Sequence, residues 1–457
     1  MAELFPILGY TTDKRFRIYA NDYEFTFLND PDRESRKPFL PILFNGLREY
    51  YDDIKTIDEF IQCETFEGQQ LAIHYGEDPL KVYDHLRLRT QCFALGDVAH
   101  FEENQGIMSI TFAGGTLDSL FFPRSLDVNC TEKIKDGVSI DFKDDSITCE
   151  TTLSDEKIKI KVASNFRFGS GADGAEIKNT GNRFTVEFGA PKPMTEILKC
   201  YRTLRGCMRI MTGRANVGVD TINYSTNISI DHSAMSLGGK FYIRKEGERT
   251  SKRAFTNITF EDLGEKLGNL WKLIYTSESS KKEYSIGFIP QNDDEYNVVD
   301  NGTIRVLCSA LEFETDKEKS IRPENNPPLK KLIQQAKQLA KEAYENGDIT
   351  ESTFNSINGG IENWSFSAKD RIKKLFEVHK GPMQIMSIQL NVANGYDIGA
   401  FVKHRNSITH GSEGMISPIV GETAILLRGL VYCSILRRIG MCEEEIISLV
   451  ERRKVNT

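Results

Sequence analysis

The stretch Asp397-Ile-Gly-Ala-Phe-Val-Lys-His-Arg-Asn-Ser-Ile-Thr-His-Gly411 contains a complete helix with a start signal and a stop signal. Asp397 is a residue type that caps helix N-termini, and Gly411 is the type that follows helix C-termini. Between them, residues of one helical stripe are mostly apolar, namely Ile398, Phe401, Val402, Ile408 and Thr409. Arg405 falls in the middle of this stripe, where an unpaired guanidinium is costly to bury.

The sequence around this stretch is helical almost throughout. Outside it, we predict helices at Ile304 to Phe313, Leu329 to Tyr344 (after Pro327-Pro328 and before Gly347), Ala368 to Val378 (with Pro382 breaking the chain soon after), Ser417-Pro418 to Arg438, and Glu443 to Arg453. We therefore assign residues 301–457 to one α-helical domain.

Residues 1–300 have a different pattern, with short runs that alternate between apolar and polar residues. Such runs are Phe16 to Tyr19, Gly106 to Phe112, Val138 to Phe142, Ile158 to Ala163 and Phe184 to Phe188. Two stretches with helical spacing, Glu196 to Met211 and Phe260 to Ile274, interrupt them. We expect an α+β multidomain protein whose first 300 residues form a sandwich or barrel-like β region with inserted helices. A candidate internal break lies near 195–255.

One motif in the β region imitates a dinucleotide-binding loop. Gly169-Ser-Gly171-Ala-Asp-Gly174 fits G-x-G-x-x-G and follows a strand-like run. A cofactor loop of this kind must lead at once into a helix, whereas turn and strand residues follow here. We therefore predict a hairpin loop and expect no cofactor.

Composition indicates an intracellular globular protein. The chain has 457 residues and a net charge of −8. Its nine cysteines are scattered, which favours reduced thiols over a disulfide framework or a zinc site. The N-terminus lacks the features of a secretory signal, and the apolar stretch Ala424 to Leu436 is short and interrupted by Arg428. We expect a cytoplasmic location and no membrane partner.

Charge is distributed unevenly between the two regions. Residues 1–300 carry 37 basic and 47 acidic side chains, a balance of −10, whereas residues 301–457 carry 21 and 19, a balance of +2. Nucleic-acid binders normally show a basic footprint. An RNA-binding surface is therefore expected to be local and to lie in the C-terminal region.

Arg405 and His410 are the candidate catalytic pair. Their R-x4-H spacing arises by chance roughly 0.4 times in a chain of this composition, so the spacing alone is weak evidence. Histidine can serve as base or acid in RNA cleavage, and arginine can stabilise the charge that builds up on phosphate. A structural role remains open, with Arg405 paired to Glu312 or Glu314 and His410 bound to carbonyls at the helix end.

Residues five apart on an ideal helix point about 140° away from each other. Arg405 and His410 therefore converge only if the helix unwinds near Gly411, or if a second subunit completes the site.

The segment FVKHRNSITHG (401–411), followed by the apolar run IVGETAILLRGLVYCSILRRIG (419–440), resembles the HEPN superfamily, whose motif is Arg, a polar residue and then His. The resemblance extends to ApeA-like proteins. IRVLCSALEFE (304–314) looks like their first HEPN helix, and CYRTLRGCMRIMTGR (200–214) and LGNLWKLIYTS (267–277) look like their N-terminal domain.

This resemblance implies a metal-independent endoribonuclease that acts in anti-phage defence as a homodimer with a composite active site. It assigns the catalytic roles to Arg405 and His410 and the supporting polar role to Asn406. Lys403 and His404 are candidate phosphate contacts beside the motif, although solvent exposure is the simpler expectation for both. RNA is the expected partner, a phage-derived molecule the expected trigger, and no metal or cofactor is expected.

Two alternatives remain open. The helical domain can be a non-catalytic module that binds RNA, nucleotide or protein. The functional site can instead lie in residues 1–300, although no paired carboxylates or Ser/His arrangement indicates one there.

Overall fold

The structure is a computed structural model. It describes residues 8–12, 16–29, 56–57, 60–74, 80–82, 85–99, 101, 105–121, 146–153, 155–171, 174–230, 233–244, 258–280, 287–290, 298–321, 326–362, 366–390, 392, 395–409, 411 and 414–452. The chain divides into two compact units. The first combines Met1–Thr212 with Asn216–Ser279, and the second combines Gly213–Ala215 with Ser280–Thr457.

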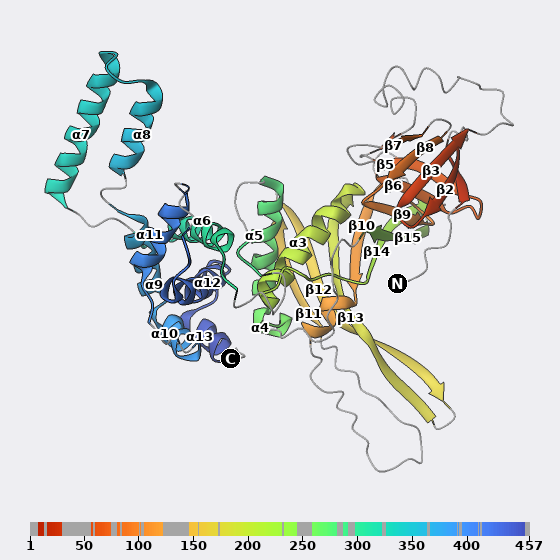
Figure 1. The fold of residues 1–457 in the computed structure, drawn as a ribbon. Helices are drawn as coiled ribbons and strands as arrows, with labels where there is room; N and C mark the ends of the chain where they lie inside the picture. Colours follow the sequence, from red (N-terminus) through yellow and green to blue (C-terminus); the bar gives the residue numbers. More distant parts are fainter. Residues whose placement is uncertain are drawn as a thin grey trace, which may run out of the picture. The chain divides into compact units, whose positions relative to one another are not determined.

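The first unit is built on one large antiparallel sheet (Figure 1). Its strands pair in the order β11-β12-β13-β10-β14-β15-β9-β6-β5-β1-β2-β3-β8-β7, and β4 also pairs with β5. The strands are β1 Leu8–Thr11, β2 Phe16–Asn21, β3 Glu24–Asn29, β4 Thr56–Ile57, β5 Phe60–Thr65, β6 Gln70–His74, β7 Leu80–Val82, β8 His85–Arg89, β9 Cys92–Gly96, β10 Ile107–Ala113, β11 Ile147–Leu153, β12 Glu156–Gly171, β13 Gly174–Lys192, β14 Thr221–Ile230 and β15 Ser233–Ile243. The predicted strand Val138 to Phe142 lies outside the described residues.

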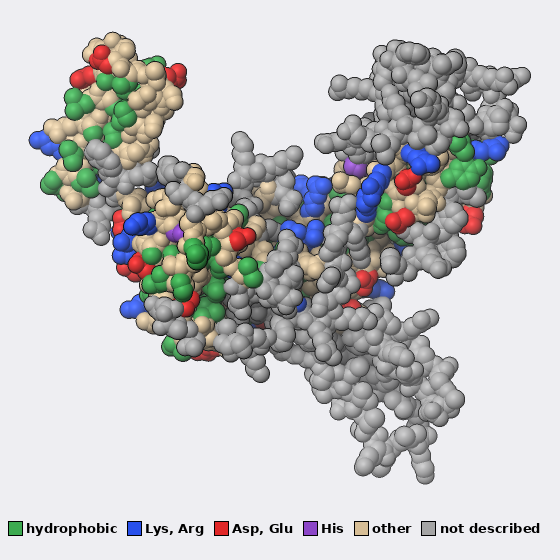
Figure 2. Space-filling model, in the orientation of Figure 1, with side chains coloured by type: hydrophobic (Ala, Val, Ile, Leu, Met, Phe, Trp, Pro, Cys, Tyr) green, Lys and Arg blue, Asp and Glu red, His purple; other side chains and the backbone are tan. Residues whose placement is uncertain are grey.

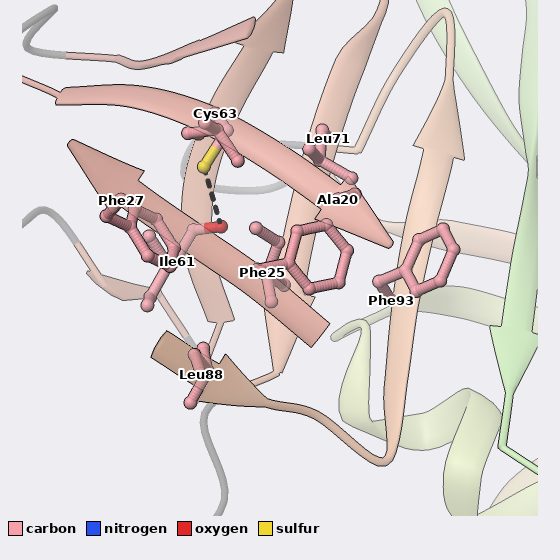
Figure 3. Close-up of a cluster of buried hydrophobic side chains, with 10 residues drawn as sticks. Ala20, Phe25, Phe27, Ile61, Cys63, Leu71, Leu88 and Phe93 are labelled. Carbon is pink, nitrogen blue, oxygen red and sulfur yellow. Dashed lines mark hydrogen bonds between the residues drawn. The ribbon is translucent and has the colours of Figure 1, made fainter. Parts of the chain in front are cut away.

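The N-terminal half of the sheet curls around a core of its own (Figure 3). The rings of Phe25 on β3 and Phe93 on β9 lie 5.3 Å apart, although five strand-to-strand steps separate β3 from β9 in the sheet. A flat sheet would hold these strands about 24 Å apart. The curl therefore brings both strands to one apolar cluster, which Ile61 and Leu71 complete from β5 and β6.

The other half of the sheet packs against helices. They are α3 Thr195–Thr212, α4 Phe260–Leu263 and α5 Lys266–Ser280, and a short 3-10 helix, Gly115–Ser119, follows β10. The ring of Phe184 on β13 stacks on Trp271 of α5 at 5.4 Å. Helices α3 and α5 pack closely, because a Cβ atom added to Gly206 would lie 2.6 Å from Ile274. The predicted combination of a β-rich region with inserted helices is confirmed.

The G-x-G-x-x-G motif lies at the end of a long β-hairpin. Strands β12 and β13 pair antiparallel as far as Gly171 opposite Gly174. No helix follows the motif, because β13 continues from Gly174 to Lys192. The predicted hairpin is therefore confirmed.

The second unit is helical (Figure 1). Its helices are α6 Asn301–Lys317, α7 Pro327–Glu345, α8 Glu351–Glu362, α9 Ala368–Val378, α10 Lys380–Gln389, α11 Ile398–Thr409, α12 Pro418–Arg438 and α13 Glu443–Arg452. Residues before α6 also belong to this unit. The Ala215 amide donates to the Pro290 carbonyl at 2.7 Å, and the ring of Phe288 packs on Tyr432 of α12 at 5.5 Å.

The predicted helices of this unit are present, and the structure has two further helices that were not predicted, α8 and α10. Pro382 was expected to break the chain but lies buried in the first turn of α10. A proline is tolerated there because first-turn amides have no partner within the helix. The break between α9 and α10 falls instead at His379.

Helix α12 is the core of the helical unit, and it contacts α6, α10, α11 and α13. Its 21 residues are long and apolar enough to cross a membrane by length and composition, but 78% of the apolar window is buried inside the protein. Such burial is typical of a core helix, and one such helix is weak evidence for a membrane span. The buried Arg428 lies within it, and burial lowers the pKa of its guanidinium.

Candidate functional site

Helix α11 carries the candidate motif, and its start is fixed by side-chain hydrogen bonds. The Asp397 carboxylate accepts from the amides of Gly399 at 2.7 Å and Ala400 at 3.1 Å, which confirms the predicted N-cap. These hydrogen bonds hold the pKa of the Asp397 carboxyl below its usual value. The Asp397 amide in turn donates to the Thr423 hydroxyl of α12 at 2.9 Å.

The end of α11 also follows the sequence prediction. The helix ends at Thr409, and Gly411 has a φ of +85°, a conformation that favours glycine. His410 lies outside the described residues, and so does its geometry relative to Arg405.

Arg405 lies at the edge of the apolar face of α11. Phe401 and Ile408 are buried, but 31% of the Arg405 side chain is exposed. Its Nη2 donates to Glu312 Oε1 of α6 at 2.9 Å, and its Nη1 donates to Asn406 Oδ1 at 3.2 Å. The apolar stripe predicts that Arg405 faces the core. Its side chain is long enough, however, for the guanidinium to reach Glu312 and solvent. Of the two candidate partners, Glu312 and Glu314, Glu312 is the one that pairs with Arg405.

Two further polar contacts join α11 to α6. His404 Nε2 and Asn301 Oδ1 lie 3.0 Å apart, within hydrogen-bonding distance. Arg305 Nη2 donates to the carbonyl of Ile408 at 2.6 Å, in the last turn of α11. His404 is therefore half-buried and bound to α6, not simply solvent-facing. No local sequence pattern points to Asn301 or Arg305, which lie 103 residues before their partners.

The other two candidate residues of the motif are exposed. Lys403 faces solvent, as the simpler expectation had it, and Asn406 is exposed beside the Arg405 guanidinium. Thr409 strengthens the same turn, since its hydroxyl donates to the Arg405 carbonyl at 2.8 Å. The motif thus presents a polar surface on the side of α11 that its buried residues do not occupy.

A second group of charged residues on α6 and α12 is more deeply buried. Glu314, which is 1% exposed, accepts from Arg438 Nη1 at 2.8 Å. Burial raises the pKa of its carboxyl to about 7, although Arg438 opposes the shift. His379 is also buried, with Nε2 3.3 Å from the Ser434 hydroxyl, and burial lowers the pKa of its ring to about 4.

The Arg405 side chain has the properties of an anion-binding group. A guanidinium carries five N–H donors in a planar fork, and the contacts with Glu312 and Asn406 occupy two of them. Burial raises the pKa of the neighbouring Cys308 thiol to about 12, while the charge of Arg405 acts in the opposite direction. Among the described residues, no group of three or more His, Cys, Asp or Glu side chains is placed to hold a metal ion.

Comparisons with protein-family models, with curated proteins and with solved structures found no match for this chain.

Proposed function

We propose that the helical unit is a HEPN-type endoribonuclease domain that cleaves RNA without a metal, with Arg405 and His410 as its catalytic residues. The sequence resemblance over 302–440 supports this assignment. The protein then acts as an anti-phage effector in the cytoplasm, and its β-rich unit senses or regulates.

One observation carries the proposal. Arg405 is held in place from α6 by Glu312, yet about a third of its side chain remains open to solvent, five residues before His410. Exposed pairs contribute only about 0–1 kcal/mol to stability, so stability alone gives little reason for this pair. Its place five residues before His410 distinguishes Arg405 from other exposed, paired arginines of this unit. A cation that must meet an incoming phosphate needs both a fixed position and an open side.

The proposed reaction uses the neighbouring ribose hydroxyl. The 2′-oxygen attacks phosphorus and loses its proton, and the bond from phosphorus to the 5′-oxygen breaks. The 5′-oxygen gains a proton, so that the products are a 2′,3′-cyclic phosphate and a 5′-hydroxyl. His410 moves one of these protons, and Arg405 stabilises the negative charge on the phosphate oxygens. Asn406 orients the Arg405 guanidinium, while Lys403 and His404 contact neighbouring phosphates.

The site is proposed to be composite, with two copies of the chain each contributing an Arg–His set. A helix that continued regularly from Arg405 to His410 would direct them about 140° apart. A symmetric pair of chains solves this problem, because each Arg405 can then act with the partner's His410.

A second candidate function is a non-catalytic HEPN module that binds RNA, nucleotide or protein. The observation that favours it is the same ion pair, since Glu312 already compensates the charge of Arg405. In this case the Arg405–Glu312 pair only holds α11 against α6, and RNA is bound without being cut.

The test is cleavage of RNA by the purified full chain in excess chelator, with the products mapped by end sequencing. We expect wild type to cut and to leave cyclic-phosphate ends. His410→Ala should lower the cleavage rate at least about 100-fold, the usual contribution of a general acid or base.

A suitable control is Arg371→Ala. Arg371 also pairs with a carboxylate of α6, Asp316, at 3.2 Å, and its side chain is 32% exposed. It should cut like wild type. Equal cleavage by wild type and His410→Ala would refute the catalytic assignment. RNA binding without any cleavage by wild type would favour the non-catalytic module, and loss of cleavage with chelator would refute the metal-free mechanism.

A further inference from the structure

Helices α7 and α8 form a hairpin whose two helices pack on each other. The rings of Tyr344 on α7 and Phe354 on α8 stack at 5.0 Å, and Ala340 and Ile361 are buried. Leu332 and Leu339 of α7 nevertheless remain 51% and 66% exposed. Figure 2 shows apolar side chains along the visible face of this hairpin.

Helix geometry explains why α8 leaves these leucines uncovered. Consecutive residues are rotated by about 100°, so Leu339 points well away from Ala340, the buried residue of α7. Leu332 and Leu339 are seven residues apart and therefore lie within about 20° of each other. They form one straight exposed edge, which we call the leucine edge.

The leucine edge belongs to a heptad pattern. Leu329, Leu332, Ala336, Leu339 and Ala343 follow the alternating spacing of three and four residues that packs one helix along another. Helix α8 covers only one side of this apolar arc. A further helix running along α7 would complete it.

Charges beside the leucine edge indicate which helix this is. Lys331, near the start of α7, and Glu342, near its end, both lie about 80–100° around the helix from Leu332, on the same side of the leucine edge. The other lysines, Lys330, Lys337 and Lys341, point away from the edge, and Lys341 pairs with Glu345 within the helix. Lys331 and Glu342 are both exposed, and Glu342 accepts a hydrogen bond from Gln338 within its own helix. An edge that is basic at one end and acidic at the other is complementary to itself when reversed.

We propose that α7 pairs antiparallel with α7 of a second copy of this chain, so that two hairpins form a four-helix bundle. Leu332 then packs against the partner's Leu339, and Leu339 against the partner's Leu332. In this register Lys331 lies about 3 Å along the axis from the partner's Glu342, which both side chains can span. The association does not depend on the proposed nuclease activity and uses a surface separate from α11.

The test is the mass of the full chain by sedimentation velocity over a range of protein concentrations. We expect wild type to self-associate and Leu332→Gln/Leu339→Gln to dissociate at concentrations where wild type does not. Val298→Gln/Ile388→Gln, which replaces two other exposed apolar residues of the helical unit, should behave like wild type. If the chain also pairs through α11, the leucine variant falls from the larger assembly to that dimer.

A charge exchange identifies the partner as a second copy in antiparallel register. Lys331→Glu and Glu342→Lys should each raise the dissociation constant severalfold, since each places like charges opposite one another. The double variant should recover, because it restores opposite charges in reversed order. A monomeric wild type, or a leucine variant with the mass of wild type, would overturn the proposal. A double variant as weak as the single ones would do so as well.

Discussion

Both faces of α6 carry acidic residues that pair with arginines, but the pairs are exposed on one face and buried on the other. Glu312 and Asp316 are four residues apart and share one face, from which they pair with Arg405 of α11 and Arg371 of α9. Glu314 lies between them in sequence but on the opposite face, where it pairs with Arg438 of α12. The Arg405–Glu312 pair is 31% and 42% exposed, whereas Glu314 is completely buried.

This difference separates an ion pair that is part of the core from one that a ligand can reach. Glu314 continues the buried stripe of α6, after Ile304, Leu307 and Leu311, so its charge is uncompensated without Arg438. Arg405 can exchange Glu312 for water or phosphate at little cost, because this pair is partly exposed. We therefore expect loss of the Glu314–Arg438 pair to change stability and loss of the Glu312–Arg405 pair to change activity.

The largest effect is expected at Arg405. Arg405→Ala should lower RNA cleavage by about 100- to 1,000-fold, the loss typical when a group that stabilises transition-state charge is removed. Its free energy of unfolding should fall by at most about 1 kcal/mol, because the pair is partly exposed. Cleavage rates and urea unfolding of the same preparations check both values. A large loss of stability would place Arg405 with the core pairs instead.

The next effect concerns stability. Arg438→Ala should lower the free energy of unfolding by about 3 kcal/mol, because it leaves the buried Glu314 carboxylate without its partner. Glu314→Gln/Arg438→Met should recover most of this loss by removing both charges. Urea unfolding measures both variants. If Arg438→Ala is as stable as wild type, the buried Glu314 does not depend on Arg438 for its stability.

A pH effect of opposite sign is expected at two buried groups. The Glu314 pKa is raised to about 7, so the folded state holds its proton more tightly, and the stability gained is lost as pH rises towards 7. The His379 pKa is lowered to about 4, so its contribution is present above pH 6.5 and is lost as pH falls towards 4.

Between pH 4 and 7, the contributions of Glu314 and His379 to the free energy of unfolding therefore change in opposite directions and largely cancel. Relative to wild type, Glu314→Gln should lose stability more steeply on acidification, and His379→Gln less steeply, each by an amount on the order of 2 kcal/mol across the range. Thermal unfolding across this range tests both. Parallel pH profiles for the three proteins would show that neither group titrates as its burial implies.

The smallest effect is expected at Arg371 of α9, which pairs with Asp316 on the same face of α6 as Glu312. Arg371→Ala should change the free energy of unfolding by less than about 1 kcal/mol, because Asp316 is 69% exposed. It should leave RNA cleavage unchanged. A loss of cleavage equal to that of Arg405→Ala would show that the whole exposed face of α6 binds RNA, and that Arg405 has no special role.

Local signals made most of the helical unit predictable. Asp397 and Gly411 define α11, and Pro327 and Gly347 mark the limits of α7, because capping and backbone conformation depend on few neighbouring residues. Helix α10 was missed because Pro382 suggests a break unless its position in the first turn is known. The burial of Glu314 could also have been predicted, since it continues the helical spacing of the apolar residues of α6.

Contacts between residues far apart in the chain could not be predicted from the sequence. Strand β10 pairs with β13 and β14, which follow it by 60 residues or more, and a single sequence offers many alternative partners for each strand. The same holds at the candidate site, where α6 supplies Glu312, Asn301 and Arg305 from about 100 residues away. Burial of Arg405 was overestimated because helical periodicity places a Cβ atom but not the end of a long side chain.

The Arg305 contact with the Ile408 carbonyl has a consequence for motion. The last carbonyls of a helix lack partners within the helix, so terminal turns normally open and close much faster than the protein unfolds. Here a guanidinium from α6 binds that last turn at 2.6 Å. The final turn of α11 should therefore open less often than an ordinary helix end, and its amides should exchange hydrogen with water more slowly. The residues after Thr409 would then follow an ordered helix end. The conformational entropy of that end is already lost when the protein folds.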